Sequence, residues 1–81
     1  MNIFVGNLPF RMSAMEVEKL FGPYGSIRSA RVILDRETGR SRGFGFVDMP
    51  DLEQAEEAIS ILNGYEIQGR PISVNFAYAR A

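Results

Sequence analysis

The most constraining feature of the sequence is the run Arg42–Met49, in which two phenylalanines alternate with glycine. Side chains two residues apart share one face of a β-strand, so Phe44 and Phe46 point to the same side. Phenylalanine usually belongs in a protein core. Burying this pair would also bury the charges of Arg42 and Asp48, and unpaired buried charge is costly. We therefore expect the opposite register, with both rings on an open face.

That register places Val47 and Met49 in the core at little cost, because both side chains are apolar. It leaves two aromatic rings on a solvent-facing strand whose first residue is an arginine. Unpaired nucleic-acid bases stack on aromatic rings arranged in this way. The run thus predicts both a strand register and a stacking surface.

The length of 81 residues predicts one small domain, residues 1–81. The sequence has neither cysteine nor histidine, which excludes disulfides, most zinc sites, thiol nucleophiles and imidazole bases. We expect no cofactor and no metal. No apolar run approaches the ~18–20 residues of a membrane span, and no signal peptide precedes the first predicted strand. The composition therefore predicts a cytoplasmic protein with no membrane partner.

The net charge of −1 argues weakly against nucleic-acid binding, because such domains often have a pI above about 9. The distribution of charge is uneven, however. Residues 28–42 hold five arginines against two acidic residues, whereas residues 51–57 hold four acidic residues and no basic one. Arginine stacks on rings and pairs with phosphate better than lysine does. The arginine cluster flanks the aromatic strand, whereas the acidic cluster is equally consistent with a solvated helix face.

Apolar periodicity and end signals predict the order βαββαβ. Strands are expected at residues 3–5, 30–34, 42–49 and 72–76, helices after the caps Ser13 and Asp51, and a small hairpin arm at residues 65–69. Each strand alternates, so one face of the sheet should be buried and the other wet. The expected fold is α+β and ferredoxin-like, a split βαβ with a four-stranded antiparallel sheet and two helices on one face.

The same alternation turns Ile3 and Val5 inward and Phe4 outward, and it turns Leu34 inward. The solvent face should then collect Asn2, Phe4, Arg31, Ile33, Arg42, Phe44, Phe46, Ser73 and Asn75. A soluble monomer seldom leaves three phenylalanines together without a use, because a contiguous apolar patch invites association. The open face is therefore the candidate binding surface.

Two of these strands carry a recognisable pattern. Arg42–Met49 resembles the octamer motif of the RNA recognition motif family, K/R-G-F/Y-G/A-F-V-x-F/Y, and Ile3–Leu8 resembles its hexamer motif. The resemblance covers the whole chain, and the chain resembles small one-domain bacterial members. Met49 departs from the usual Phe or Tyr, but it should point inward and affect packing alone.

The resemblance implies that Phe4 and Phe44 each stack under a base, that Phe46 inserts near the sugars, and that Arg42 pairs with a phosphate. The full set of candidate RNA-binding residues is Phe4, Phe44, Phe46, Arg42, Arg31, Asn2, Ile33, Asn75 and Arg80. The expected function is non-catalytic binding of single-stranded RNA by a monomer. Whether Asp48 would accept from a base amino group or repel phosphate stays open.

The sequence disfavours catalysis and leaves two alternative binding functions open. Gly43-Phe44-Gly45 lacks the rest of a phosphate-binding fingerprint and lies within a strand, which disfavours an enzyme. A protein-interaction module would use the helical face, where the acidic second helix could hold a basic partner. Single-stranded DNA is a further alternative, because stacking is indifferent to the sugar.

Overall fold

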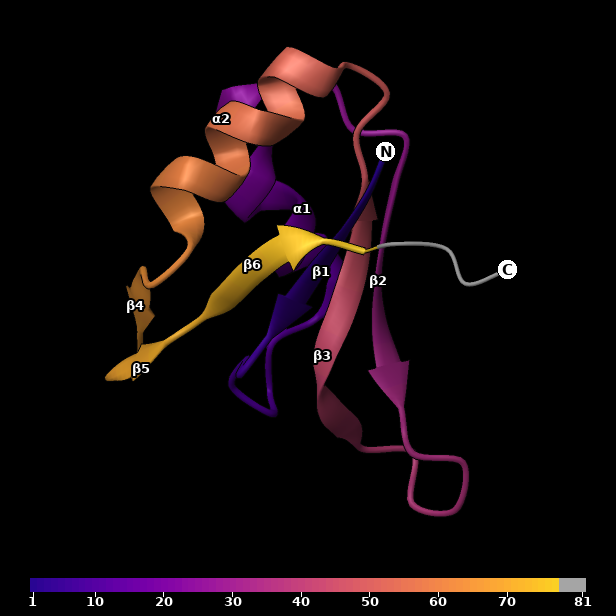
Figure 1. Cartoon of the computed structure of the whole chain (residues 1–81). Helices are drawn as coiled ribbons and strands as arrows, with labels where there is room; N and C mark the ends of the chain where they lie inside the picture. Colours follow the sequence, from indigo (N-terminus) through magenta and orange to yellow (C-terminus); the bar gives the residue numbers. More distant parts are fainter. Residues whose placement is uncertain (78–81) are drawn as a thin grey trace.

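Two helices cover one face of a four-stranded antiparallel sheet, and the structure, a computed structural model, describes residues 1–77 (Figure 1). The sheet has the order β2-β3-β1-β6, from β1 (Asn2–Gly6), β2 (Ser29–Leu34), β3 (Ser41–Asp48) and β6 (Ser73–Phe76). The helices are α1 (Ala14–Phe21), which runs into a 3-10 turn (Gly22–Tyr24), and α2 (Leu52–Leu62). The predicted ferredoxin-like βαββαβ fold is confirmed.

The core lies between the sheet and the helices and follows the predicted alternation. The sheet contributes Ile3, Val5, Val47 and Val74, and the helices contribute Val17, Phe21, Ala55, Ala58 and Leu62, all with at most 2% of their surface exposed. Met49, just beyond β3, is also fully buried. The register predicted from the charges on the Arg42–Met49 run is therefore confirmed, and one face of the sheet is left uncovered by the helices.

Both helices begin where their caps predict. The Ser13 Oγ accepts from the Glu16 backbone N–H at 3.3 Å, and the Glu16 carboxylate accepts from the Ser13 backbone N–H at 3.4 Å, which completes a capping box. At the start of α2 the Asp51 carboxylate accepts from the Gln54 backbone N–H at 3.0 Å. Each cap satisfies a backbone donor that the helix itself leaves unpaired.

The pairing of β2 with β3 changes register between Val32 and Leu34, and this was not predicted. Gly43, opposite this irregularity, has a φ of +82°, a conformation that glycine adopts without steric cost. Leu34 lies on the same side as Val32, as expected, since both line one hollow beside Met12 and Ser13, but its side chain is 55% exposed. The alternation along a strand gives the face on which a side chain lies and not whether another element covers it.

A short hairpin joins α2 to β6, as expected. It consists of β4 (Glu66–Ile67) and β5 (Arg70–Pro71), which pair antiparallel. Gln68 and Gly69 between them both have positive φ, the geometry of a tight two-residue hairpin turn. In residues 1–77 no helix is both long and apolar enough to cross a bilayer.

Candidate nucleic-acid interface

Three phenylalanine rings gather on the open face of the sheet. Phe4 projects from the central strand β1, and Phe44 and Phe46 project from its neighbour β3, where the register sets Phe4 directly opposite Phe46. The ring centroids are 5.8 Å apart for Phe4–Phe44, 6.0 Å for Phe4–Phe46 and 6.2 Å for Phe44–Phe46. All three side chains are half-buried. We call these residues the phenylalanine triad.

The position of the triad depends on close pairing between β3, which carries two of its rings, and the edge strand β2. A Cβ at Gly45 would collide with the backbone carbonyl of Arg31 on β2. Only glycine lets β2 and β3 pair closely at this point. Gly45 therefore holds Phe44 and Phe46 on a continuous sheet and brings Arg31 opposite Phe46.

Positive charge adjoins the triad from two sides. The guanidinium carbon of Arg31 lies 5.6 Å from the centroid of the Phe46 ring, within the range of a cation–π contact. Arg42 is exposed and lines a hollow of about 270 Å³ together with Phe4 and Phe44. Backbone N–H groups of Thr38 and Glu37 lower the pKa of Asp35 in the adjacent loop, and the charge of Arg42 lowers it further.

The remaining predicted residues lie at different distances from this centre. Asn75 on β6 is exposed and faces Phe4 across the ladder, and Asn2 is exposed two residues before Phe4. Ile33 is half-buried at the register shift, so it is not paired in line with the triad. Arg80, like Tyr78, lies outside the described residues. The structure thus brings together the triad, Arg31, Arg42 and Asn75.

Asp48 has a partner on this face. Its Oδ1 accepts a hydrogen bond from the N-terminal ammonium group of Met1 at 3.1 Å. Its backbone carbonyl accepts from the Arg28 N–H at 2.8 Å. The side chain whose role the sequence left open is thus engaged within the protein. Across residues 1–77, His, Cys, Asp and Glu side chains form no group of three that could hold a metal.

Two residues beside the triad were absent from the predicted set. Phe10 in the β1–α1 loop and Arg70 in β5 both line the hollow shared by Phe4, Arg42 and Phe44. The Arg70 guanidinium carbon lies 5.4 Å from the Phe10 ring centroid. An aromatic residue followed by Arg11 in a loop was the available signal for Phe10. Nothing in the sequence pairs it with Arg70, because the two are distant along the chain.

Curated relatives of this chain include plant proteins. The 28 kDa ribonucleoprotein of the Spinacia oleracea chloroplast is 47% identical over 78 residues, which cover 96% of this chain and 34% of the relative. Other plant relatives are also chloroplast proteins. The cytoplasmic location predicted from composition is therefore wrong, and the resemblance to bacterial members is not supported. Targeting signals are read separately from the folded domain, so the composition of the domain does not reveal the compartment.

Solved structures agree with the fold. The RNA Binding Protein PG1 is 52% identical with a TM-score of 0.94, covering 100% of this chain and 98% of that one. The protein in the Sxl-lethal protein/RNA complex is 32% identical with a TM-score of 0.92, covering 99% of this chain and 48% of that one. The family model described as RNA recognition motif matches residues 3–73. On this match, and on the two motifs that form the open face, the chain belongs to the RNA recognition motif family.

Proposed function

We propose that residues 1–81 act as one unit that binds single-stranded RNA on the open face of the sheet, as a monomer and without catalysis. The observation that carries the proposal is the phenylalanine triad, with Arg31 over Phe46, on the face that the helices leave uncovered. Similar proteins support it, since they include a ribonucleoprotein, an RNA-binding protein and the protein of a protein/RNA complex.

The ring geometry suits bases that are not stacked on one another. Phe4 and Phe44 are tilted by 31° with centroids 5.8 Å apart, so each offers a face to a separate base. Phe46 is perpendicular to Phe44 and offers an edge, which suits a position between two sugars. A duplex keeps its base faces inside the stack, whereas a single strand can splay them over aromatic rings. The triad should therefore select single strands.

Polar residues around the triad would orient the bound RNA strand. Arg42, near the start of β3, would neutralise a phosphate, and Arg31 beside Phe46 would pair with a phosphate or a base edge. The Asn75 side-chain amide, opposite Phe4, can donate to a base and accept from it. Asn2 and Ile33 would make contacts at the margins. Arg80 stays a proposed contact beyond the described residues.

The competing partners predict different binding patterns. Single-stranded DNA would stack equally well, so only contacts to the 2′-hydroxyl can separate the two polymers. A protein partner would instead use the outer face of α2, where Glu53, Glu56 and Glu57 are exposed. These partners contact opposite sides of the molecule. Substitutions on one side should leave binding on the other side unchanged.

The test is a titration of the chain with mixed-sequence single-stranded RNA, single-stranded DNA and duplex RNA, followed by fluorescence anisotropy. We expect the affinity for single-stranded RNA to be micromolar or weaker, and the affinity for single-stranded DNA to be lower than that for RNA. The affinity for duplex RNA should be at least about tenfold lower than that for single-stranded RNA, the equivalent of one lost stacking contact. Phe44→Ala should weaken RNA binding, and Ile61→Ala, an exposed apolar residue on α2, is the matched control. Equal affinity for duplex and single strand would refute the proposal.

A further inference from the structure

Phe10 is an exposed aromatic ring held in place by its neighbours. It is 64% exposed, which is unusual for phenylalanine. The Arg70 guanidinium lies over the ring, and the Arg70 side chain also donates to the Leu8 carbonyl at 3.5 Å. A Cβ at Gly43 would lie 3.4 Å from the Phe10 ring, so the ring packs beside that glycine. These contacts fix an accessible ring at the margin of the phenylalanine triad.

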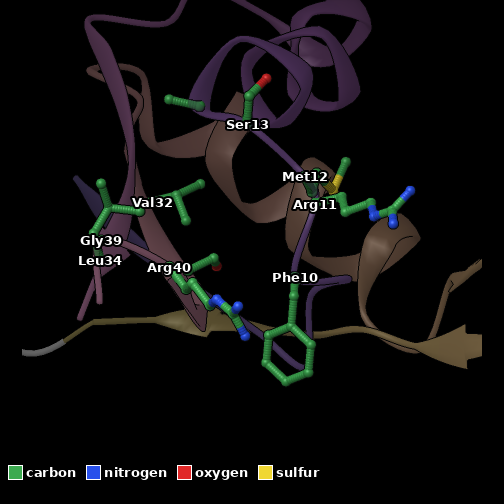
Figure 2. A pocket seen from close by; sticks show the side chains of 10 residues that line it. Phe10, Arg11, Met12, Ser13, Val32, Leu34, Gly39 and Arg40 are labelled. Carbon is green, nitrogen blue, oxygen red and sulfur yellow. The ribbon is translucent and has the colours of Figure 1, made fainter. Parts of the chain in front are cut away.

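On its other side, Phe10 borders a second hollow, larger than the one it shares with Phe4 and Phe44. This hollow, of about 690 Å³, lies between the β1–α1 loop and the β2–β3 loop, and Figure 2 shows the Phe10 ring and the Arg40 guanidinium projecting to the same side of it. Leu34, whose side chain is 55% exposed, forms part of its wall. The lining also contains Arg11 and Arg40 and no carboxylate.

The chemistry of this hollow matches a nucleotide. Phe10 and Leu34 offer an aromatic and an aliphatic surface to a base, and the two arginines offer positive charge to a phosphate. A volume of about 690 Å³ lies within the roughly 300–1,000 Å³ range of ligand sites. Phe10 lines both this hollow and the smaller one that contains Phe4 and Phe44. An RNA strand that leaves the triad can therefore pass over Phe10 without losing contact with the protein.

We propose that Phe10, with the hollow behind it, binds one further nucleotide of the strand that occupies the triad. The base lies against the Phe10 ring on the side away from Arg70, and Arg40 holds the phosphate that follows. This inference rests on the proposed RNA binding and extends it from the sheet to the β1–α1 and β2–β3 loops. It makes affinity depend on RNA length.

The test compares two mixed-base RNA pools, of roughly four and roughly eight nucleotides, because the triad accommodates two or three bases and longer strands reach beyond it. Phe10→Ala should weaken binding of the longer pool by about 5- to 150-fold, the worth of one stacked base. It should change binding of the shorter pool by less than about twofold, the usual limit for independent sites. Affinities are measured by NMR titration on protein whose thermal melt is unchanged.

The matched control is Met15→Ala, because Met15 on α1 is 65% exposed and lies away from both hollows. It should alter neither titration. An equal effect of Phe10→Ala on both pools, or no effect on either, would overturn the proposal. Phe44→Ala should weaken both pools. If it weakens neither, the proposed RNA binding and this inference fall together, whereas a failure confined to Phe10 leaves the RNA binding intact.

A second pair of variants tests the phosphate contact. Arg40→Gln should lower the steepness of the log–log salt dependence for the longer pool by roughly 0.7, one phosphate contact on a single strand. Arg36→Gln is the control, because Arg36 is an exposed arginine of the same loop that does not line the hollow. Identical slopes for the two variants would remove Arg40 from the site and overturn this part of the proposal.

Discussion

The two faces of β3 can be separated by substituting two residues of one strand, Val47 and Phe44. Val47 is fully buried, and Val47→Ala removes two methyl groups. At about 0.8 kcal/mol per buried carbon the transfer cost is about 1.6 kcal/mol, and the cavity raises it to about 2–3 kcal/mol. A domain of 81 residues is stable by about 4–12 kcal/mol, so the variant stays folded. Its melting temperature should fall by roughly 10–20 °C.

Phe44→Ala should have the opposite profile. The side chain is half-buried on the open face, where its ring contacts are with Phe4 at 5.8 Å and Phe46 at 6.2 Å. Losing such aromatic contacts costs about 0.5–1.5 kcal/mol of stability. Losing a stacked base costs about 1–3 kcal/mol of binding, which is a roughly 5- to 150-fold weaker affinity for single-stranded RNA.

The assay is a denaturant melt of each variant together with an anisotropy titration against one single-stranded RNA, at a temperature where both variants are folded. Val47→Ala should lose stability and keep its affinity, and Phe44→Ala should do the reverse. If Val47→Ala melts like the parent protein and Phe44→Ala unfolds, the proposed assignment of the buried and open faces of β3 is inverted. If both variants bind like the parent, Phe44 has no part in recognition.

Three further outcomes are expected. With two or three phosphate contacts, the slope of log affinity against log salt concentration should be near −1.5 to −2 for RNA binding. The slope should become shallower in Arg42→Ala and should stay unchanged in Glu56→Gln on α2. A slope steeper than about −4 would contradict the small number of contacts. Gly45→Ala should destabilise the domain, because the new Cβ meets the backbone carbonyl of Arg31, which cannot rotate away. The NMR signal of the Arg31 amide, across the ladder, should shift. An unperturbed β2–β3 pairing would contradict this. Backbone N–H groups of the β2–β3 loop lower the pKa of Asp35 in that loop. The ionised carboxylate therefore stabilises the fold above the ordinary carboxyl pKa, and this contribution is lost as the pH falls through the lowered pKa. An NMR titration of Asp35 that gives an ordinary pKa would contradict this.

Local rules were enough to give the buried face of the strands and the starts of the helices. The alternation of side chains along a strand, together with the cost of burying Arg42 and Asp48, turned Phe44 and Phe46 to the open face. Ser13 and Asp51 set the helix starts, because a cap acts on backbone groups within three residues of it. These features are encoded by neighbours in the sequence.

The sequence by itself therefore determined the fold class, the buried face and the triad, whereas the tertiary structure decided what surrounds the triad. The register shift between β2 and β3 depends on how two strands pair, and a period-of-two pattern within one strand cannot reveal it. The contact of Arg70 with Phe10 joins a hairpin and a loop at opposite ends of the chain. Local periodicity is a property of one segment, but a long-range contact exists only after the segments have been brought together by the packing of the core.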